Sequence, residues 1–208
     1  MKEEVEMGFF LIDARNAFIE GNRTNMLWTV WHLWPTGARF TFNCYRHHLM
    51  LYLKSADGCE FEIIHSREEV TQGDPFPMIA YVILLLPMIQ ILRKEFPDIF
   101  QPWYADDGAG MAPIPRLFLL YNHLRAIGSK YRYYPDASKS ILIVEHKGVA
   151  RATKLIESFS FKVTTGLGYL GIFISERGAQ IEWTRSQVEN WEEGATQIAT
   201  LTATHLMV

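Results

Sequence analysis

The sequence predicts an α+β fold in which helices cover an antiparallel sheet. Three observations lead to this class. Short apolar segments bounded by turn residues indicate strands, and longer segments with apolar residues at helical spacing alternate with them. The composition, 49% hydrophobic and 21% charged, is typical of a globular protein. The length of 208 residues fits one domain, and no repeat or linker-like stretch interrupts it.

The first predicted strand covers residues 9–12 and ends at Asp13. A helix is expected next, capped by Thr24 or Asn25 and stopped by Pro35. Apolar residues recur along it at helical spacing: Leu27, Val30, Trp31 and Trp34. We expect this stripe to face the core rather than to stack on nucleic-acid bases.

A hairpin is expected where residues 49–53 and 59–64 flank the turn sequence Ser-Ala-Asp-Gly. Thr-Gln-Gly at 71–73 then leads into Asp74, an N-cap, and Pro75, the first helical residue. The helix is expected to run to residue 92, with Pro87 kinking or splitting it. The turn before it would present Gln72 and the backbone of Gly73 at a helix N-terminus.

A second hairpin is expected within residues 100–112, where apolar segments flank the turn sequence Asp-Asp-Gly-Ala-Gly at 106–110. A helix over 117–127, a strand over 140–144 and a helix over 149–159 follow. Short strands are predicted at 162–165, 169–174 and 180–183. Thr184 and Gln187 form a capping box, which predicts the start of a last helix toward residue 206.

Charge and cysteine content exclude several classes. A net charge of -3 and a pI near 6.2 argue against a free-standing polyanion binder. Cys44 and Cys59 are the only cysteines, and with His47 and His48 they match no zinc-finger spacing. The N-terminus lacks the pattern of a signal peptide, and no uncharged stretch reaches the ~20 residues of a spanning helix. An intracellular protein, in nucleus or cytoplasm and with no membrane partner, is expected.

Three carboxylates carry the candidate chemistry: Asp13 at a strand end, and Asp106 and Asp107 at a hairpin tip. Neighbouring acids repel and a buried one needs a positive partner, which a pair of divalent ions supplies. Oxygen ligands suit Mg²⁺, and two ions activate an attacking oxygen and stabilise a leaving one. Strand alternation ranks Asp106 with Asp13 as bridging ligands and Asp107 second. The alternative is structural, with Asp13 as a helix cap and Asp107 in a plain turn.

These residues resemble, in order and spacing, three motifs of reverse transcriptases. Asp-Ala-Arg-Asn-Ala-Phe at 13–18 resembles the first motif, Thr-Gln-Gly-Asp-Pro at 71–75 the second and Tyr-Ala-Asp-Asp at 104–107 the third. The resemblance covers residues 9–174 and is closest to the branch encoded by eukaryotic retroelements. It implies the palm domain of an RNA-directed DNA polymerase, which is a nucleotidyltransferase.

The resemblance also implies site roles. Asp13, Asp106 and Asp107, with the backbone carbonyl of Ala14, would hold two Mg²⁺ ions, for which Mn²⁺ can substitute. Phe18 would exclude a ribose 2′-OH, although its alternative reading is a core aromatic. The remaining assignments place Gln72 and Gly73 along the incoming nucleotide and template, and Lys139 beside the departing pyrophosphate.

A primer-grip hairpin is implied by Gly168, Tyr169, Leu170 and Gly171, which resemble the fifth motif. With Gly166 these residues also spell a nominal dinucleotide fingerprint. That fingerprint must open a helix, whereas a strand is predicted to follow here, so we reject it.

The resemblance divides the chain into a palm with its primer-grip-like hairpin, 1–183, and a C-terminal helix, 184–208, which would start a thumb. Fingers and thumb are otherwise largely missing, which would also explain the modest acidity, and little activity is expected from the chain alone. The implied partners are an RNA or DNA template with primer and deoxynucleoside triphosphates. Two alternatives stay open: a non-catalytic retroelement remnant that binds nucleic acid or protein, and an unrelated metal-dependent nuclease, which leaves Phe18, Gln72 and Gly73 unexplained.

Overall fold

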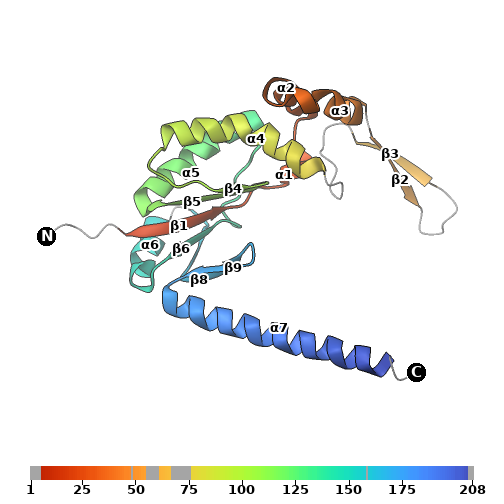
Figure 1. The fold of residues 1–208 in the computed structure, drawn as a ribbon. Coiled ribbons are helices and arrows are strands. Elements are labelled where there is room, and N and C mark those ends of the chain that lie inside the picture. Colours follow the sequence, from red (N-terminus) through yellow and green to blue (C-terminus); the bar gives the residue numbers. More distant parts are fainter. Residues whose placement is uncertain (1–5, 48, 55–60, 67–75, 158, 206–208) are drawn as a thin grey trace.

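A five-stranded sheet forms the centre of the molecule (Figure 1). The computed structural model describes residues 6–47, 49–54, 61–66, 76–157 and 159–205. The strand order is β4-β5-β1-β6-β7. The strands are β1 (Met7–Ile12), β4 (Trp103–Tyr104), β5 (Asp107–Pro113), β6 (Ile141–Val144) and β7 (Lys162–Thr164). The α+β class is confirmed.

The sheet is mixed, so the expectation of a wholly antiparallel sheet was wrong at one pair. β1 pairs antiparallel with β5 and with β6, and β4 pairs antiparallel with β5. β6 and β7 run parallel. A parallel pair needs a crossover between its strands, and the 3-10 turn His146–Gly148 and helix α6 (Val149–Leu155) provide it.

Two helices cover one face of this sheet, α4 (Phe76–Glu95) and α5 (Ile114–Gly128) (Figure 1). Alternation along β1 directs Phe10 and Ile12 into the core that these helices close. Glycines permit the close contact, because a Cβ on Gly110 would come within 3.1 Å of Leu117. α4 continues as one helix through Pro87, so the predicted split does not occur. A 3-10 turn, Ser129–Tyr131, follows α5.

The opposite face of the sheet packs against a separate hairpin of β8 (Gly166–Tyr169) and β9 (Ile172–Ser175). Leu11 and Ile143 form a small second cluster there, and Leu167, Tyr169 and Ile174 pack against it. The strand predicted at 162–165 is present as β7. The single strand predicted at 169–174 was wrong, because the hairpin turn at Leu170 and Gly171 divides that stretch between the end of β8 and β9. This hairpin carries the residues predicted to form a primer grip.

Helices and a hairpin inserted between β1 and α4 form a peripheral unit. Its elements are α1 (Ala17–Glu20), α2 (Arg23–Leu33), α3 (Pro35–Tyr45), β2 (Leu49–Lys54) and β3 (Phe61–Ser66). The hairpin was predicted correctly. Asn22, rather than Thr24 or Asn25, caps α2, since its side chain accepts from the backbone N of Asn25 at 2.8 Å. Pro35 ends α2 as expected but also begins α3, which was not predicted, because proline fits the first turn of a helix.

The apolar stripe of α2 faces the core only in part. Val30 is buried, and Leu27 and Trp34 pack against the core. Trp31 is 66% exposed, so the prediction was wrong for this residue. Trp31 follows the buried Val30 by one residue, which places it about 100° further round the helix axis and beyond the packed face. Periodicity alone does not locate the edge of that face.

The last helix, α7, runs from Arg177 to His205 and projects away from the sheet (Figure 1). The strand predicted at 180–183 and the capping box at Thr184 were therefore wrong. Thr184 lies inside the helix, where its hydroxyl donates to the carbonyl of Gln180 at 2.8 Å. Trp183 stacks on Phe173 of β9 with ring centroids 5.5 Å apart, which fixes the start of α7 against the hairpin.

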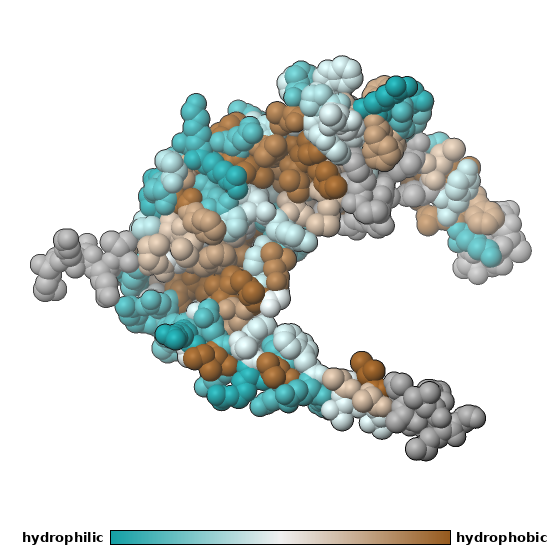
Figure 2. All heavy atoms as spheres, in the orientation of Figure 1, coloured by the Kyte–Doolittle hydropathy of each residue, from teal (hydrophilic) through white to brown (hydrophobic). Residues whose placement is uncertain are grey.

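The molecule has the outline of an arc in Figure 2, hollowed between the β2–β3 end and α7. Within the part of the chain that the structure describes, none of the helices combines the length and the apolar character that a membrane crossing requires. The division of the chain into 1–183 and 184–208 stays a prediction.

Candidate active site

The carboxylates of the first and third motifs lie at the same end of the sheet. Ile12 pairs with Gly108, so the antiparallel register places Asp13 opposite Asp107. Asp106 lies in a two-residue turn, because Tyr104 pairs with Asp107. The predicted turn at 106–110 is thus shorter and earlier: residues 107–110 are already strand, and Ala105 takes the left-handed backbone, φ 52°.

Glycine in this strand serves packing rather than a turn. A Cβ on Gly108 would come within 2.9 Å of the Trp103 ring. Trp103 in turn meets the Tyr133 ring edge to face, with centroids 5.8 Å apart. The packing of Trp103 on Tyr133 therefore depends on the absence of a side chain at position 108.

Charge repulsion links the three acids. Burial raises the pKa of Asp13 above its ordinary value, and the charges of Asp106 and Asp136 add to this while Lys139 opposes it. Burial also raises the pKa of Asp107, and the charges of Asp106 and Asp13 act in the same direction. The site therefore favours a cation or a proton beside these carboxylates.

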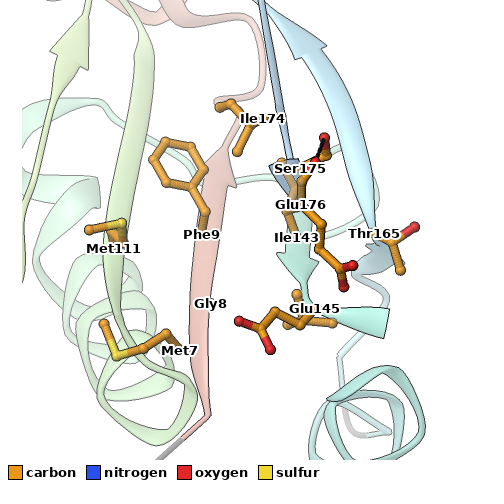
Figure 3. A pocket seen from close by; sticks show the side chains of 11 residues that line it. Met7, Gly8, Phe9, Met111, Ile143, Glu145, Thr165, Ile174, Ser175 and Glu176 are labelled. Carbon is orange, nitrogen blue, oxygen red and sulfur yellow. Dashed lines mark hydrogen bonds between the residues drawn. The ribbon is translucent and has the colours of Figure 1, made fainter. Parts of the chain in front are cut away.

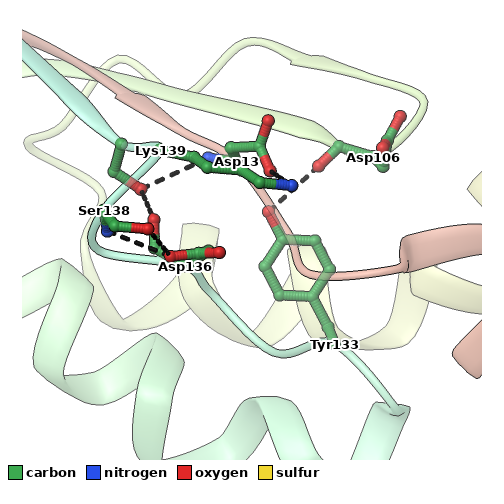
Figure 4. A network of polar contacts seen from close by, with 7 residues as sticks. Asp13, Asp106, Tyr133, Asp136, Ser138 and Lys139 are labelled. Carbon is green, nitrogen blue, oxygen red and sulfur yellow. Dashed lines mark hydrogen bonds and ion pairs between the residues drawn. The ribbon is translucent and has the colours of Figure 1, made fainter.

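Lys139 supplies one positive charge. Its Nζ lies 3.8 Å from Oδ1 of Asp13, and both side chains are about half exposed (Figure 4). Nearby, Asp136 accepts hydrogen bonds from the backbone N and the hydroxyl of Ser138, which hold its pKa low. This turn fixes the backbone that carries Lys139.

The segment before β6 ties the two acidic motifs together. The buried hydroxyl of Tyr133 donates to the backbone carbonyl of Asp106 at 3.0 Å (Figure 4). The backbone N of Asp136 donates to the carbonyl of Asp13 at 2.8 Å. Ser140 is fully buried, accepts from the backbone N of Asp13 at 3.3 Å and donates to the carbonyl of Asp136 at 2.7 Å.

Sequence reasoning missed these supporting residues. Asp136 and Ser138 carry a local signal, since Asp two residues before Ser is typical of an Asx turn. Tyr133 and Ser140 carry none, because their contacts join segments far apart in the chain. Ala14 is buried and forms an isolated bridge with Pro135, which fixes its backbone beside Asp13.

A cavity of about 180 Å³ adjoins the acids. Asp13, Asp107, Lys139 and Tyr169 all line it, together with Leu11, Ile12, Gly108, Ile141 and Leu167. Burial, then the charges of Asp107 and Asp106, raises the pKa of Tyr169 to about 12. The structure thus brings a predicted primer-grip residue to the predicted carboxylates.

The other hairpin residues lie at or near its turn. Leu170 and Gly171 have φ of 48° and 81° and join β8 to β9. Gly168 and Leu170 are exposed. Gln72 and Gly73 lie outside the described residues, and so does the side chain of Phe18, whose backbone belongs to α1.

A second cavity of about 240 Å³ lies on the same face of the sheet, toward the start of β1 (Figure 3). Met7, Phe9, Met111 and Ile174 line its apolar part. Glu176 lies at its edge and accepts from the backbone N of His146 at 2.7 Å, so this carboxylate has a structural role. None of the predicted site residues lines this cavity.

The donor set beside the first cavity suits a hard divalent ion, since it consists of carboxylate oxygens that repel one another. Among residues 6–47, 49–54, 61–66, 76–157 and 159–205, however, no three His, Cys, Asp or Glu side chains are grouped so as to hold a metal ion. Cys44 is an exposed free thiol, and Cys59 and His48 lie outside the described residues. The carboxylate oxygens are therefore suitable ligands for Mg²⁺, but the described side chains are not already arranged as a metal-binding group.

Comparison with known proteins gives no match to a protein-family model and none to a curated protein. Solved structures do match. The telomerase of Candida albicans, solved with the TWJ fragment of telomeric RNA, has a TM-score of 0.59 at 11% identity over 82% of this chain and 30% of that one. An apo telomerase of Candida tropicalis, truncated from its C-terminal domain, has a TM-score of 0.60 at 12% identity. That match covers 84% of this chain and 35% of the telomerase.

The chain has a telomerase-like fold. Telomerase is a reverse transcriptase, so the architecture agrees with the fold that the three motifs implied. The chain spans about a third of the length of these telomerases. At 11–12% identity the likeness concerns the fold alone.

Proposed function

We propose that this chain is the palm of an RNA-directed DNA polymerase of retroelement origin, which transfers nucleotides to a primer 3′-OH. One observation carries the proposal: Asp13, Asp106 and Asp107 converge at one end of a telomerase-like sheet, and their charges act on one another. Folding alone gives no reason to gather acids at one place.

In this proposal the three aspartates and the backbone carbonyl of Ala14 hold two Mg²⁺ ions. When bound, such ions activate the attacking oxygen and stabilise the leaving one. The chain's own contribution is positional. Tyr133 and Ser140 fix the two acidic segments relative to each other, through the carbonyl of Asp106 and the backbone N of Asp13.

Lys139 and Tyr169 complete the proposed site. The charge of Lys139 opposes the rise in the pKa of Asp13 that burial causes. In this proposal its ammonium would neutralise or protonate departing pyrophosphate. Tyr169 lines the same cavity, where a primer end would approach. Phe18 as the 2′-OH filter, and Gln72 and Gly73 at the nucleotide, complete the proposal. The partners would be a template with primer and deoxynucleoside triphosphates, in keeping with the telomeric RNA of the Candida telomerase structure.

Metal binding tests the acids directly. Mn²⁺ titration of the whole chain, followed by electron paramagnetic resonance, should show binding that Asp13→Asn and Asp107→Asn each weaken at least tenfold. Asp98→Asn is the matched control. Asp98 lies away from the site and forms an ion pair with Arg116, with 2.6 Å between the two side chains. Primer extension with Mn²⁺ should then be lost in Asp106→Ala, and unchanged extension in that variant would contradict the assignment.

A non-catalytic scaffold is the second candidate. The observation in its favour is that the described residues hold no preformed group of three metal-binding side chains. Absence of Mn²⁺ binding by the unaltered chain, at millimolar ion and neutral pH, would favour the scaffold over the polymerase.

A further inference from the structure

Helices α2 and α3 expose large aromatic side chains. Trp28 and Trp31 are 64% and 66% exposed, and Phe40 and Phe42 are 59% and 49% exposed. Trp28 and Trp31 share one face of α2, and α3, which packs beside α2, carries Phe40 and Phe42 on different sides. The exposed aromatic residues of these two adjacent helices are called the α2–α3 aromatic surface below. Tryptophan is normally largely covered in a folded protein, so two exposed indoles three residues apart on one helix indicate a surface that binds something.

The charge around this surface indicates the kind of partner. From Gly21 to Ala56 the sequence contains no Asp or Glu, although the whole chain has a net charge of -3. Of the four basic residues in the same stretch, Arg39, Arg46 and Lys54 are exposed, and Arg23 is buried. A locally basic, aromatic segment within an acidic chain is complementary to a polyanion rather than to an apolar protein face.

The surface is held in place before any partner arrives. The ring of Trp28 stacks on that of His32, with centroids 3.9 Å apart and planes at 27°. The guanidinium of Arg46 lies over the Phe42 ring at 5.8 Å. Arg23, which is 6% exposed, donates to the carbonyl of His47 at 2.9 Å and so joins the start of α2 to the end of α3.

We propose that the α2–α3 aromatic surface binds single-stranded nucleic acid, with bases stacking on Trp28 and Trp31 and phosphates pairing with Arg39 and Arg46. Every base has a flat face, so stacking of this kind tolerates any sequence. A duplex keeps its bases stacked within itself and offers only phosphates. The inference rests on the proposed function in one respect, since a polymerase needs an unpaired template strand.

Binding is measured on the whole chain in EDTA without nucleotides, so that the result is independent of the metal site. Fluorescence anisotropy with a labelled oligo(dT) or oligo(U) should show that Trp28→Ala and Trp31→Ala each weaken single-strand binding about tenfold, which corresponds to one lost base stack. Trp191→Ala is the matched control: Trp191 is 69% exposed on α7, and its removal should leave binding unchanged. Arg39→Ala and Arg46→Ala should each lower the salt dependence of binding by about one ion.

Several results would overturn the proposal. They are equal binding of single strands and hairpin duplexes, undiminished binding by Trp28→Ala and Trp31→Ala, or no binding of either nucleic acid. If Trp28→Ala changed the sedimentation of the chain and not its affinity for oligo(dT), the surface would be a protein contact. Because oligo(dT) binding is measured in EDTA and the polymerase assignment is tested by Mn²⁺ binding, failure of this inference and failure of the polymerase assignment remain distinguishable.

Discussion

The hydroxyl of Tyr133 donates a hydrogen bond of 3.0 Å to the backbone carbonyl of Asp106. The ring of Tyr133 is fully buried, and Asp106 lies in the tight turn between β4 and β5. The contact connects the segment before β6 to the turn that carries the third motif, Tyr-Ala-Asp-Asp. The neighbouring Ala105 has φ 52°, a conformation that an alanine adopts only when its surroundings hold it there.

Tyr133→Phe should lower the free energy of unfolding by about 1 kcal/mol, because a buried carbonyl loses its donor while the ring still packs. Urea denaturation measures this. Tyr121→Phe is the control, since Tyr121 lies in the same core, 1% exposed, and makes edge contacts with Phe10 that the variant retains. Equal losses in the two variants would mean that the contact with Asp106 stabilises nothing specific.

Asp107→Asn should stabilise the protein at neutral pH. The folded state raises the pKa of Asp107 above its ordinary value of 3.8, so the ionised carboxylate opposes folding above the folded pKa. As the pH falls below 3.8 the carboxyl is protonated in both states, and the advantage of Asn should disappear. We expect a gain at pH 7 toward the lower end of about 0.5–2 kcal/mol, since solvent screens this group.

Thermal unfolding from pH 3 to pH 7 tests that dependence. Asp98→Asn should act in the opposite direction, because Arg116 holds the pKa of Asp98 below its ordinary value. A stabilisation by Asp107→Asn that persists unchanged at pH 3 would argue against repulsion among the carboxylates as its cause.

Local patterns predicted the elements whose signals lie within a few residues. The apolar run before Asp13 and the turn sequences of both hairpins are such signals, and the strands that they predicted are present. The turn of the second hairpin lies at residues 105–106 rather than at 106–110. The prediction of a strand at 180–183 was wrong. Gln-Ile-Glu-Trp alternates polar and apolar residues like a strand, but in the structure this segment belongs to the long helix that follows the β8–β9 hairpin. The start of α3 was not predicted, because a proline after a helical segment indicates a stop as well as a possible first residue of a new helix.

Gly108→Ala should destabilise the hairpin. The added Cβ would come within 2.9 Å of the Trp103 ring, and displacing a packed indole costs about 1–3 kcal/mol. Gly194→Ala is the matched control within α7, where no atom lies within 4 Å of the new Cβ. That variant should increase helix content, because alanine is favoured over glycine by about 1 kcal/mol in a helix. Chemical denaturation and circular dichroism measure the two effects, and equal effects of both changes would contradict the packing argument.

Lys139→Met should leave stability within about 0.5 kcal/mol, because exposed ion pairs contribute little. It should instead raise the pKa of Asp13 further, since Lys139 is the charge that lowers it. Carbon-detected NMR titration of the Asp13 carboxyl measures this shift. Lys154→Met, on α6, serves as the control, and an unmoved Asp13 titration in Lys139→Met would show that the 3.8 Å pair carries no interaction in solution.

The candidate site was predictable only in part. Asp13, Asp106 and Asp107 could be singled out because acids at strand ends and turns are visible in the sequence, and the β1–β5 register brings Asp13 and Asp107 together. The support from Tyr133 and Ser140 was not predictable, since both contacts depend on how the segment before β6 passes beneath the acids.

The position of β1 at the centre of the sheet has a consequence for how the chain folds. Both of its neighbours, β5 and β6, follow it by about half the chain or more. During synthesis β1 emerges before either partner exists, so one of its edges stays unpaired until β5 has been made and the other until β6 has been made. Closing such long loops is entropically costly and slow. We therefore expect a slow refolding phase and a need for chaperones, with Phe10 among the last core residues to be protected from solvent.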